Sequence, residues 1–343
     1  MDLSRRDFAT LLAGGVAGLA IPASLRALDL GGTAAVGARL GAGRAQATYF
    51  EWHAVGQRVR VAMEGGGNTL LYLGDRGALQ SDGKNFGLGR ILRREAEAQG
   101  RSVSHFVNTH HHGDHSGGND GFTDLARVAH ANALPRIVAT AESNLERARE
   151  TLPRTAAQMR EQGAPAAAIA EVETTLAALA DLAPTSFAPT ETFESEHEVS
   201  LDGHPVELRW ASRGHTDGDA FVYLPEENVL HCGDLLFQGR HPFVDASSGA
   251  TPAGWIRCVD AMLALTDAET VVVPGHGELT DREGLGAQKT YFDRLQEMVA
   301  GAIREGRSRD EVVALAPADL VALPSAERML PQNLGIVYDE MVG

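Results

Sequence analysis

A short segment near the first third of the chain holds a dense group of potential metal ligands. The run Thr109-His110-His111-His112-Gly113-Asp114-His115 contains four histidines and one carboxylate. Neutral imidazole nitrogen and carboxylate oxygen are ligands of zinc and similar divalent ions. In an extended segment His110 and His112 project to the same side, and Gly113 lets the chain bend before Asp114 and His115. The spacing therefore predicts a metal loop that serves two adjacent ions.

Further candidate ligands follow downstream, each where an apolar run meets a glycine-rich turn. They are His215 in Gly214-His215-Thr216, Asp234 in Cys232-Gly233-Asp234, and His276 in Pro274-Gly275-His276-Gly277. Buried strands read as short apolar runs, and rigid sheets position functional side chains at strand ends. An exposed histidine run, or one structural zinc site, would explain neither the carboxylate nor these later histidines. The four segments are therefore expected to converge on one site.

These segments, in this order, resemble the metallo-β-lactamase superfamily of metallohydrolases. The resemblance runs from residue 67 to residue 277 and also includes Asp82 in Gln80-Ser81-Asp82-Gly83. It implies an α/β fold, an αββα sandwich of two similar halves. To this fold the sequence adds a helical insert at residues 141–183 and helices at the C-terminal end.

The same resemblance implies a set of metal ligands. The first site would use His110, His112 and His215, the second would use Asp114, His115 and His276, and Asp234 would bridge both ions. Two zinc ions are expected, with iron or manganese as other divalent ions that such a site accepts. The best-known β-lactamase subclass carries a cysteine at the position of Asp234 and lacks the histidine ligand found here at His115. This departure favours esters, thioesters or lactones over β-lactams as substrates without removing the β-lactams.

A dinuclear site of this kind predicts hydrolysis by a metal-bridging hydroxide, with Asp114 orienting the nucleophile. Two other classes stay open. A mononuclear iron dioxygenase on the same fold, similar to the persulfide dioxygenases, would use His110 or His112 together with His215 and Asp234. A non-catalytic metal-binding protein would need a closed coordination shell, for which the sequence offers no extra ligand.

Supporting residues are expected around these ligands. Asp82, Thr216, Asp217 and Asp219 are acceptors that could hold the second nitrogen of a ligand histidine, although Asp217 and Asp219 equally fit a polar turn that caps its own backbone. Arg240 and His241 lie on a loop after Asp234 that is expected to overhang the site and bind substrate. Arg240 would pair with an anionic group, or else be a solvated loop cation.

The first 47 residues resemble an export signal. Ser4-Arg5-Arg6-Asp7-Phe8 precedes a mildly apolar stretch at 9–21 and then Pro22, the layout of a twin-arginine signal. This layout predicts a disordered leader at 1–47, transport by the twin-arginine machinery and a periplasmic protein with no stable membrane span after signal removal. An uncleaved anchor is the alternative, but the stretch is shorter than the roughly 20 residues of a spanning helix.

Composition limits the partners. The formal charge of -16 argues against a general nucleic-acid surface, which needs an excess of lysine and arginine, so a small-molecule substrate is expected. With two cysteines, Cys232 and Cys258, the chain is not a disulfide scaffold, although one bridge between them stays open.

The elements that must carry these residues follow from apolar periodicity. Strands are expected within 65–82 and at 103–108, and helices at 88–99, 252–265, 288–304 and within 310–323. The insert should be two helices separated at Gly163-Ala164-Pro165. It would roof the site, offer a partner interface or simply pack as a hairpin. Residues 48–343 are expected to form one catalytic domain.

Overall fold

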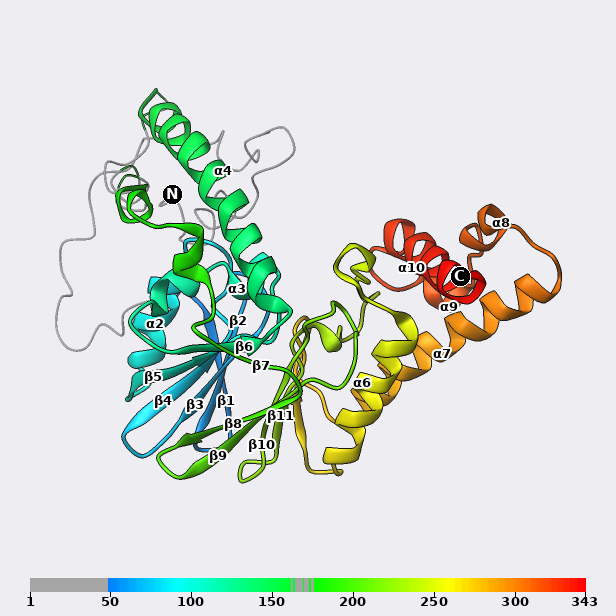
Figure 1. Ribbon diagram of the computed structural model, residues 1–343, viewed down its shortest axis with the longest axis horizontal. Coiled ribbons are helices and arrows are strands. Elements are labelled where there is room, and N and C mark those ends of the chain that lie inside the picture. The colour runs from blue at the N-terminus through cyan, green and yellow to red at the C-terminus, as the bar shows by residue number, and fades with distance from the viewer. Residues whose placement is uncertain (1–48, 162, 164–168, 170–172, 174–175) are drawn as a thin grey trace, which may run out of the picture.

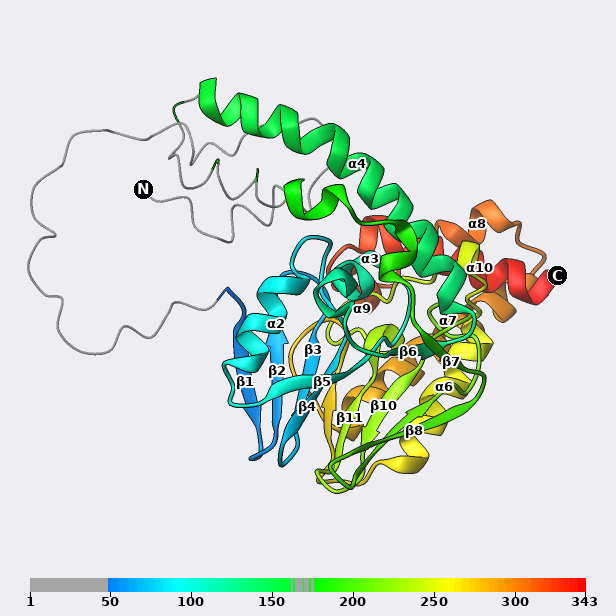
Figure 2. The same ribbon diagram turned by 60° about the vertical axis from the view of Figure 1, so that its left-hand side comes forward.

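The computed structural model describes residues 49–161 and 176–343, together with residues 163, 169 and 173. In these residues two β-sheets lie face to face, and helices cover the outer side of each sheet (Figures 1 and 2). This arrangement confirms the predicted α/β fold with an αββα sandwich. The predicted leader at 1–47 lies outside the described residues.

The first sheet has seven strands that follow one another in chain order. They are β1 (Glu51–Val55), β2 (Val59–Met63), β3 (Thr69–Leu73), β4 (Gly77–Ser81), β5 (Ser102–Val107), β6 (Arg127–His130) and β7 (Glu191–Phe193). β1 to β4 pair antiparallel, whereas β4 to β7 pair parallel. Parallel neighbours need long crossover connections, and a helix lies in each of the three here. The carboxyl ends of β4 and β5 therefore meet at one edge, where the metal loop begins.

The second sheet has five strands in the order β12-β11-β10-β9-β8. They are β8 (Glu196–Leu201), β9 (His204–Arg209), β10 (Phe221–Leu224), β11 (Val229–His231) and β12 (Val271–Val273). Asp202 and Gly203 join β8 to β9 with positive φ angles of 55° and 96°, the conformation that a tight hairpin turn requires. β11 and β12 pair parallel, so that the turns carrying Asp234 and His276 leave the sheet side by side.

Helices occupy most of the connections. They are α2 (Gly89–Glu97), α3 (Gly113–Ser116), α4 (Ala133–Glu161), α6 (Pro252–Leu265), α7 (Arg282–Arg304), α8 (Arg309–Val313), α9 (Ala318–Val321) and α10 (Ala326–Val342). α6 has the predicted bounds, while α7 begins at Arg282 rather than at residue 288. α10 was not predicted, because Pro331 and Gly335 within it argue against a helix. Tertiary packing overrides that preference here, since Leu334 and Val337 are fully buried.

Three apolar layers hold the sandwich together. The middle layer joins the facing sheets through side chains such as Val61, Leu70 and Leu208. α2 packs on the outer face of the first sheet, α6 and α7 pack on the second around Trp255, and α10 packs against α6 and α7. The metal loop and the turns with His215, Asp234 and His276 all leave this frame at the same end of the strands. Packed sheets on this scale give those turns fixed positions.

The insert begins earlier than expected, with α4 at Ala133 rather than at residue 141. Thr140 and Asn144 on α4 lie beside Gly113 of the metal loop, so this helix borders the site. Farther along, α4 projects away from the sheets (Figure 1). The expected break at Gly163-Ala164-Pro165 falls largely outside the described residues.

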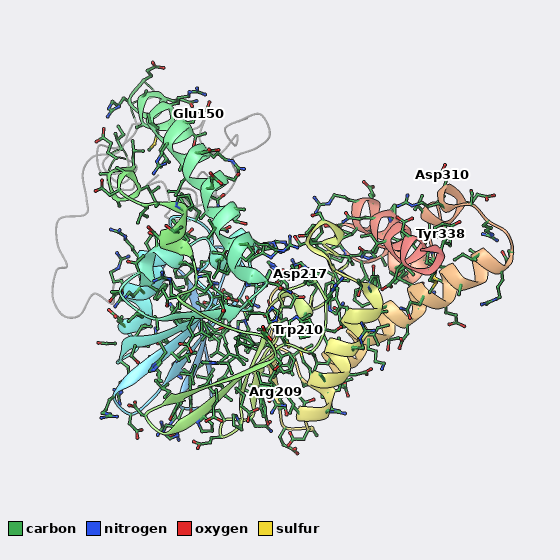
Figure 3. The ribbon with its side chains drawn as sticks, in the orientation of Figure 1. Glu150, Arg209, Trp210, Asp217, Asp310 and Tyr338 are labelled. Carbon is green, nitrogen blue, oxygen red and sulfur yellow. The ribbon has the colours of Figure 1, made fainter. Side chains whose placement is uncertain are left out.

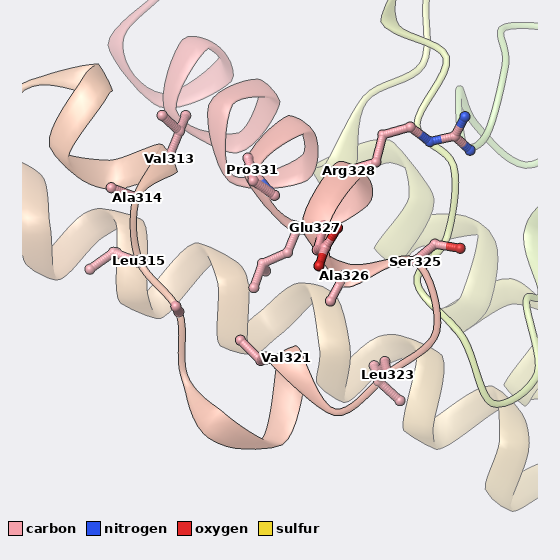
Figure 4. Close-up of a pocket in the computed structure, with 12 residues that line it drawn as sticks. Val313, Ala314, Leu315, Val321, Leu323, Ser325, Ala326, Glu327, Arg328 and Pro331 are labelled. Atoms are coloured by element: carbon pink, nitrogen blue, oxygen red, sulfur yellow. The ribbon is translucent and has the colours of Figure 1, made fainter.

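A cavity lies among the C-terminal helices α8, α9 and α10 (Figure 4). Its volume is about 770 Å³, and Leu315, Leu323 and Leu330 are among the side chains that line it. None of the predicted metal ligands borders this cavity. In the part of the chain that is described, no helix is long and apolar enough to cross a bilayer.

Candidate metal centre

The metal loop changes conformation at His112, from an extended segment to a helical turn. Asn108 still pairs with β6, because its backbone N–H donates to Val128 O at 2.9 Å. His112 is extended, with φ -60° and ψ 147°, and α3 begins directly after it. The helical turn that begins at Gly113 brings the centre of the His115 ring to 4.4 Å from that of the His110 ring, so His115 is not directed away from His110 as the bend at Gly113 was expected to direct it.

The first ligand group consists of His110, His112, His215 and Asp234, with one potential ligand atom from each lying within 4.8 Å of all the others. His215 Nε2 lies 2.7 Å from His112 Nδ1 and 3.3 Å from Asp234 Oδ2. The turn with His215 is fixed against the metal loop, since Ala220 N donates to Thr109 O. The structure thus gathers the histidines that the sequence assigns to a first site.

Asp114, His115 and His276 form the second group, again with their potential ligand atoms within 4.8 Å of one another. His276 Nε2 lies 3.2 Å from Asp114 Oδ2. Asp234 stands between the two groups: its Oδ1 lies 3.0 Å from His115 Nε2 and its Oδ2 lies 3.3 Å from His276 Nε2. This is the position that a bridging carboxylate requires.

The cluster fits a metal better than it fits a hydrogen-bonded network. His110 Nε2 is buried and has no hydrogen-bond partner among the described residues, and the buried pair His115 Nε2 and Asp234 Oδ1, although 3.0 Å apart, lacks the geometry of a hydrogen bond. Burying such atoms without a partner is costly. Imidazole nitrogens and carboxylate oxygens aimed at common points are a donor set for zinc.

Charges within the cluster are strongly coupled. Burial lowers the pKa of His215 to about 3 and that of His110 well below its usual value, so both rings are neutral, the form that binds metal. Burial opposes ionisation of Asp234, but the charges of His276 and His115 outweigh it and hold the pKa of this carboxyl well below its usual range. The same two histidines, again against burial, lower the pKa of Asp114 to about 2.

Glycines allow the close approach of the ligand turns. A Cβ on Gly275 would overlap the Asp234 carboxylate, and one on Gly233 would overlap Thr109. Gly233 also has a φ of 51°, which disfavours other residues. The glycines beside Asp234 and His276 therefore serve packing at the site.

Asp82 holds the position that the sequence predicts for it. Its Oδ2 lies 2.8 Å from His115 Nδ1, and its Oδ1 accepts a hydrogen bond from Thr109 N. One fully buried carboxylate thus orients a ligand ring and the start of the metal loop.

The other predicted supporting residues act elsewhere. Thr216 donates through its N–H and its hydroxyl to Asp219, which therefore caps its own turn. Asp217 accepts two hydrogen bonds from Arg136 and lies at the foot of α4 (Figure 3). In the described structure neither Thr216 nor Asp217 holds a ligand ring, because His215 Nδ1 donates instead to Phe243 O at 2.6 Å.

Asp245 supports the first ligand group, although no sequence pattern indicates it. Its Oδ2 lies 3.0 Å from His112 Nε2, and its Oδ1 caps the short turn of Ser247 and Ser248. In sequence, Asp245 before two serines reads as an ordinary turn cap. Only the fold brings it to His112.

The prediction for His241 is wrong. Its side chain is buried, with Nδ1 at 2.7 Å from Tyr291 Oη and Nε2 at 2.9 Å from Leu320 O. It faces the C-terminal helices, whose position the sequence did not reveal. Arg240 is exposed, and Phe243 on the same loop is 37% exposed with its ring 5.9 Å from those of His112 and His215.

Cys232 and Cys258 are both buried free thiols. The disulfide bond between them that the sequence allowed is therefore not formed.

Known proteins share this fold and part of this sequence. Residues 83–276 match the family model described as metallo-beta-lactamase superfamily. A metallo-beta-lactamase type 2 from Bacteroides fragilis is 32% identical over 109 residues, which are 32% of this chain and 44% of that protein. The enzyme of the same name from Bacillus cereus is 27% identical over 94 residues, 27% of this chain and 37% of that protein. The matched segments therefore span less than half the length of either relative.

Solved structures extend the likeness of fold. The crystal structure of DIM-1 metallo-beta-lactamase has a TM-score of 0.51 at 16% identity and covers 71% of this chain and 97% of its own. A metallo-beta-lactamase from Pontibacter korlensis has a TM-score of 0.52 at 16% identity, covering 71% of this chain and 99% of its own.

Proposed function

Because this chain belongs to the metallo-beta-lactamase superfamily, we propose that it is a dinuclear zinc hydrolase. Its substrate would be a small ester, thioester, lactone or β-lactam. One observation carries the proposal: Asp234 lies within 3.3 Å of ligand nitrogens from both groups, His215 on one side and His115 and His276 on the other. A carboxylate in this position would be able to bridge two ions, which supports a two-metal site.

Two bound zinc ions would supply a water acidified to hydroxide near neutral pH and polarise the carbonyl under attack. The protein's own contribution is position and proton control. Asp114 has a side chain that is 30% exposed, so a carboxylate oxygen that does not bind metal would be able to accept a hydrogen bond from the attacking water. His112 and His276 are also partly exposed, and this marks the open side of the cluster where substrate would enter.

The loop after Asp234 would meet the substrate. Arg240 is exposed there and could bind an anionic group, as the carboxylate of a β-lactam would provide. Phe243 lies beside His112 and His215 and could contact an apolar group next to the scissile bond. These roles of Arg240 and Phe243 are compatible with all four substrate classes.

The iron dioxygenase is the alternative. It needs only two histidines and one carboxylate, which the first group provides. A mononuclear iron site would not use Asp114, His115 and His276 as ligands, although these three side chains lie together beside Asp234. The second group therefore favours hydrolysis.

A panel of nitrocefin, an acyl-thioester, a lactone and a phosphodiester tests the proposal on zinc-loaded protein. We expect turnover of at least one carbonyl substrate, and its loss in Asp234→Ala. Asp260→Ala, which changes an exposed carboxylate on α6 paired with Lys289, serves as the matched control and should keep full activity. Absence of turnover for every member, or undiminished activity in Asp234→Ala, would contradict the proposal.

A further inference from the structure

A short glycine loop between β2 and β3, residues 64–68, lies against the second ligand group. Gly67 N donates to Asp114 O at 3.1 Å, and Asn68 N donates to Gly275 O at 2.7 Å, next to His276. A Cβ on Gly67 would overlap the His115 imidazole. The loop thus contacts Asp114 and His115 of this group directly and reaches the backbone on either side of His276.

The side chain of Lys84 binds this loop through a hydrogen bond. The residue is fully buried, and its Nζ donates to Gly67 O at 2.7 Å and to Ala62 O at 2.6 Å. The ammonium also lies 5.4 Å from the centre of the Phe50 ring. Two carbonyls and an aromatic face thereby surround the charged group.

The backbone of Lys84 adds a second connection to the site. Its φ is 70°, and its carbonyl accepts a hydrogen bond from Gly118 N at 3.0 Å, just after α3. The preceding residue, Gly83, donates to His115 O at 2.6 Å. Residues 83 and 84 therefore join the glycine loop to the helical turn that carries Asp114 and His115.

Keeping an ammonium group in this place is costly. Burial opposes its charge and lowers the pKa of Lys84 to about 7, even though the charges of Asp82 and Asp114 favour protonation. An apolar side chain would fill the same volume without that cost. What an apolar side chain cannot do is bind the Gly67 carbonyl.

We propose that Lys84 is a positioning residue for the second metal site, acting through its hydrogen bond to Gly67. This bond presses the glycine loop onto Asp114 and His115 and keeps their side chains directed at a common point. The first group has no contact of this kind with the loop among the described residues. The inference rests on the proposed two-metal function and goes beyond it by giving the two sites different supports.

Single-site backgrounds of the full-length chain test the inference. His215→Ala leaves the second group, and His276→Ala leaves the first. In each background, zinc affinity is measured with a competing chromophoric chelator, with Lys84 intact and with Lys84→Met. We expect the methionine to weaken binding about 10-fold or more in the His215→Ala background and by less than about 2-fold in the other.

Lys289→Met is the matched control, because it makes the same change at an exposed lysine on α7 and should alter neither affinity. If Lys84→Met does not fold, Lys84→Leu replaces it, since it also lacks a donor for the Gly67 carbonyl and should cause the same selective loss. If Lys84→Met changes zinc affinity equally in both backgrounds, or in neither, the inference about Lys84 is overturned and the two-metal function is not. Failure of the His215→Ala protein with native Lys84 to bind zinc would instead overturn the two-metal function, and the inference with it.

Discussion

At the scale of single residues, the spacing of histidines and aspartates predicted metal ligands, and the fold brings those ligands together. The H-x-H-x-D-H loop and the glycine-flanked His215 and His276 are recognisable because ligand types at turn positions are rare outside metal sites. Asp245 carried no prediction, and His241 was wrongly expected to bind substrate, since neither a turn cap nor a loop histidine shows in sequence which segment it faces. Their partners, His112 and Tyr291, come from distant segments.

Replacing Asp245 tests the support of the first ligand group. Asp245→Ala removes the acceptor 3.0 Å from His112 Nε2, so the ring loses its fixed orientation and we expect zinc affinity to fall about 10- to 100-fold. Asp245→Asn keeps an acceptor oxygen and should recover part of that loss. Chelator competition measures both variants, and an unchanged affinity in Asp245→Ala would show that His112 needs no such partner.

Asp120 should make stability depend on pH. Burial raises its pKa to about 7 from 3.8, although Arg90 opposes the rise. The folded protein therefore holds a proton that the unfolded chain releases between about pH 4 and pH 7, and the free energy of unfolding falls as pH rises through this range. Above it, Asp120→Asn should be more stable than the native protein by about 1 to 4 kcal/mol.

Urea unfolding at about pH 5 and about pH 8 measures this difference. The asparagine variant should show a smaller loss of stability between the two conditions than the native protein. Parallel losses in both proteins would mean that Asp120 is not the group that titrates.

At the scale of elements, the well-predicted pieces are those whose ends carry local signals. α6 begins with Thr251 as its cap and Pro252 in its first turn, and its bounds are as predicted. β1 and β2 were missed, because β1 is largely exposed and lacks a continuous apolar run. α10 and the early start of α4 depend on packing against distant parts of the chain, which periodicity alone does not show.

Trp255 links α6 to the site. It is fully buried, its Nε1 donates to Leu235 O at 2.8 Å, and its ring lies 5.5 Å from that of His215. Trp255→Ala should lower the free energy of unfolding by about 3 to 5 kcal/mol, because it leaves a large cavity in the core. Val321→Ala, at a side chain 49% exposed, should change it by less than about 0.5 kcal/mol in the same urea titration. A cost near that of the control would contradict the packing described here.

At the scale of the whole molecule, the family and the sandwich followed from the order of five short motifs. Residues 48–343 as one catalytic domain stays a prediction, and so does the role of the insert, although α4 borders the metal loop. The substrate could not be predicted, because the motifs specify ligands and the loops that select a substrate vary independently of them.

We further propose export to the periplasm through the twin-arginine machinery, on the strength of Arg5 and Arg6 before an apolar stretch. Replacing both arginines with lysine should leave the full-length precursor in the cytoplasm of a bacterial host, while the native chain appears in the periplasmic fraction. Cell fractionation with an antibody to the folded domain gives the readout. Equal export of both forms would exclude this route.

The most direct test of the two-metal account is the metal content per chain of protein purified without added metal, with Asp234→Ala alongside. We predict about two zinc ions for the native chain, as a bridging carboxylate between two ligand groups requires, and fewer than one for the variant. One iron per chain, or full occupancy in Asp234→Ala, would contradict the account.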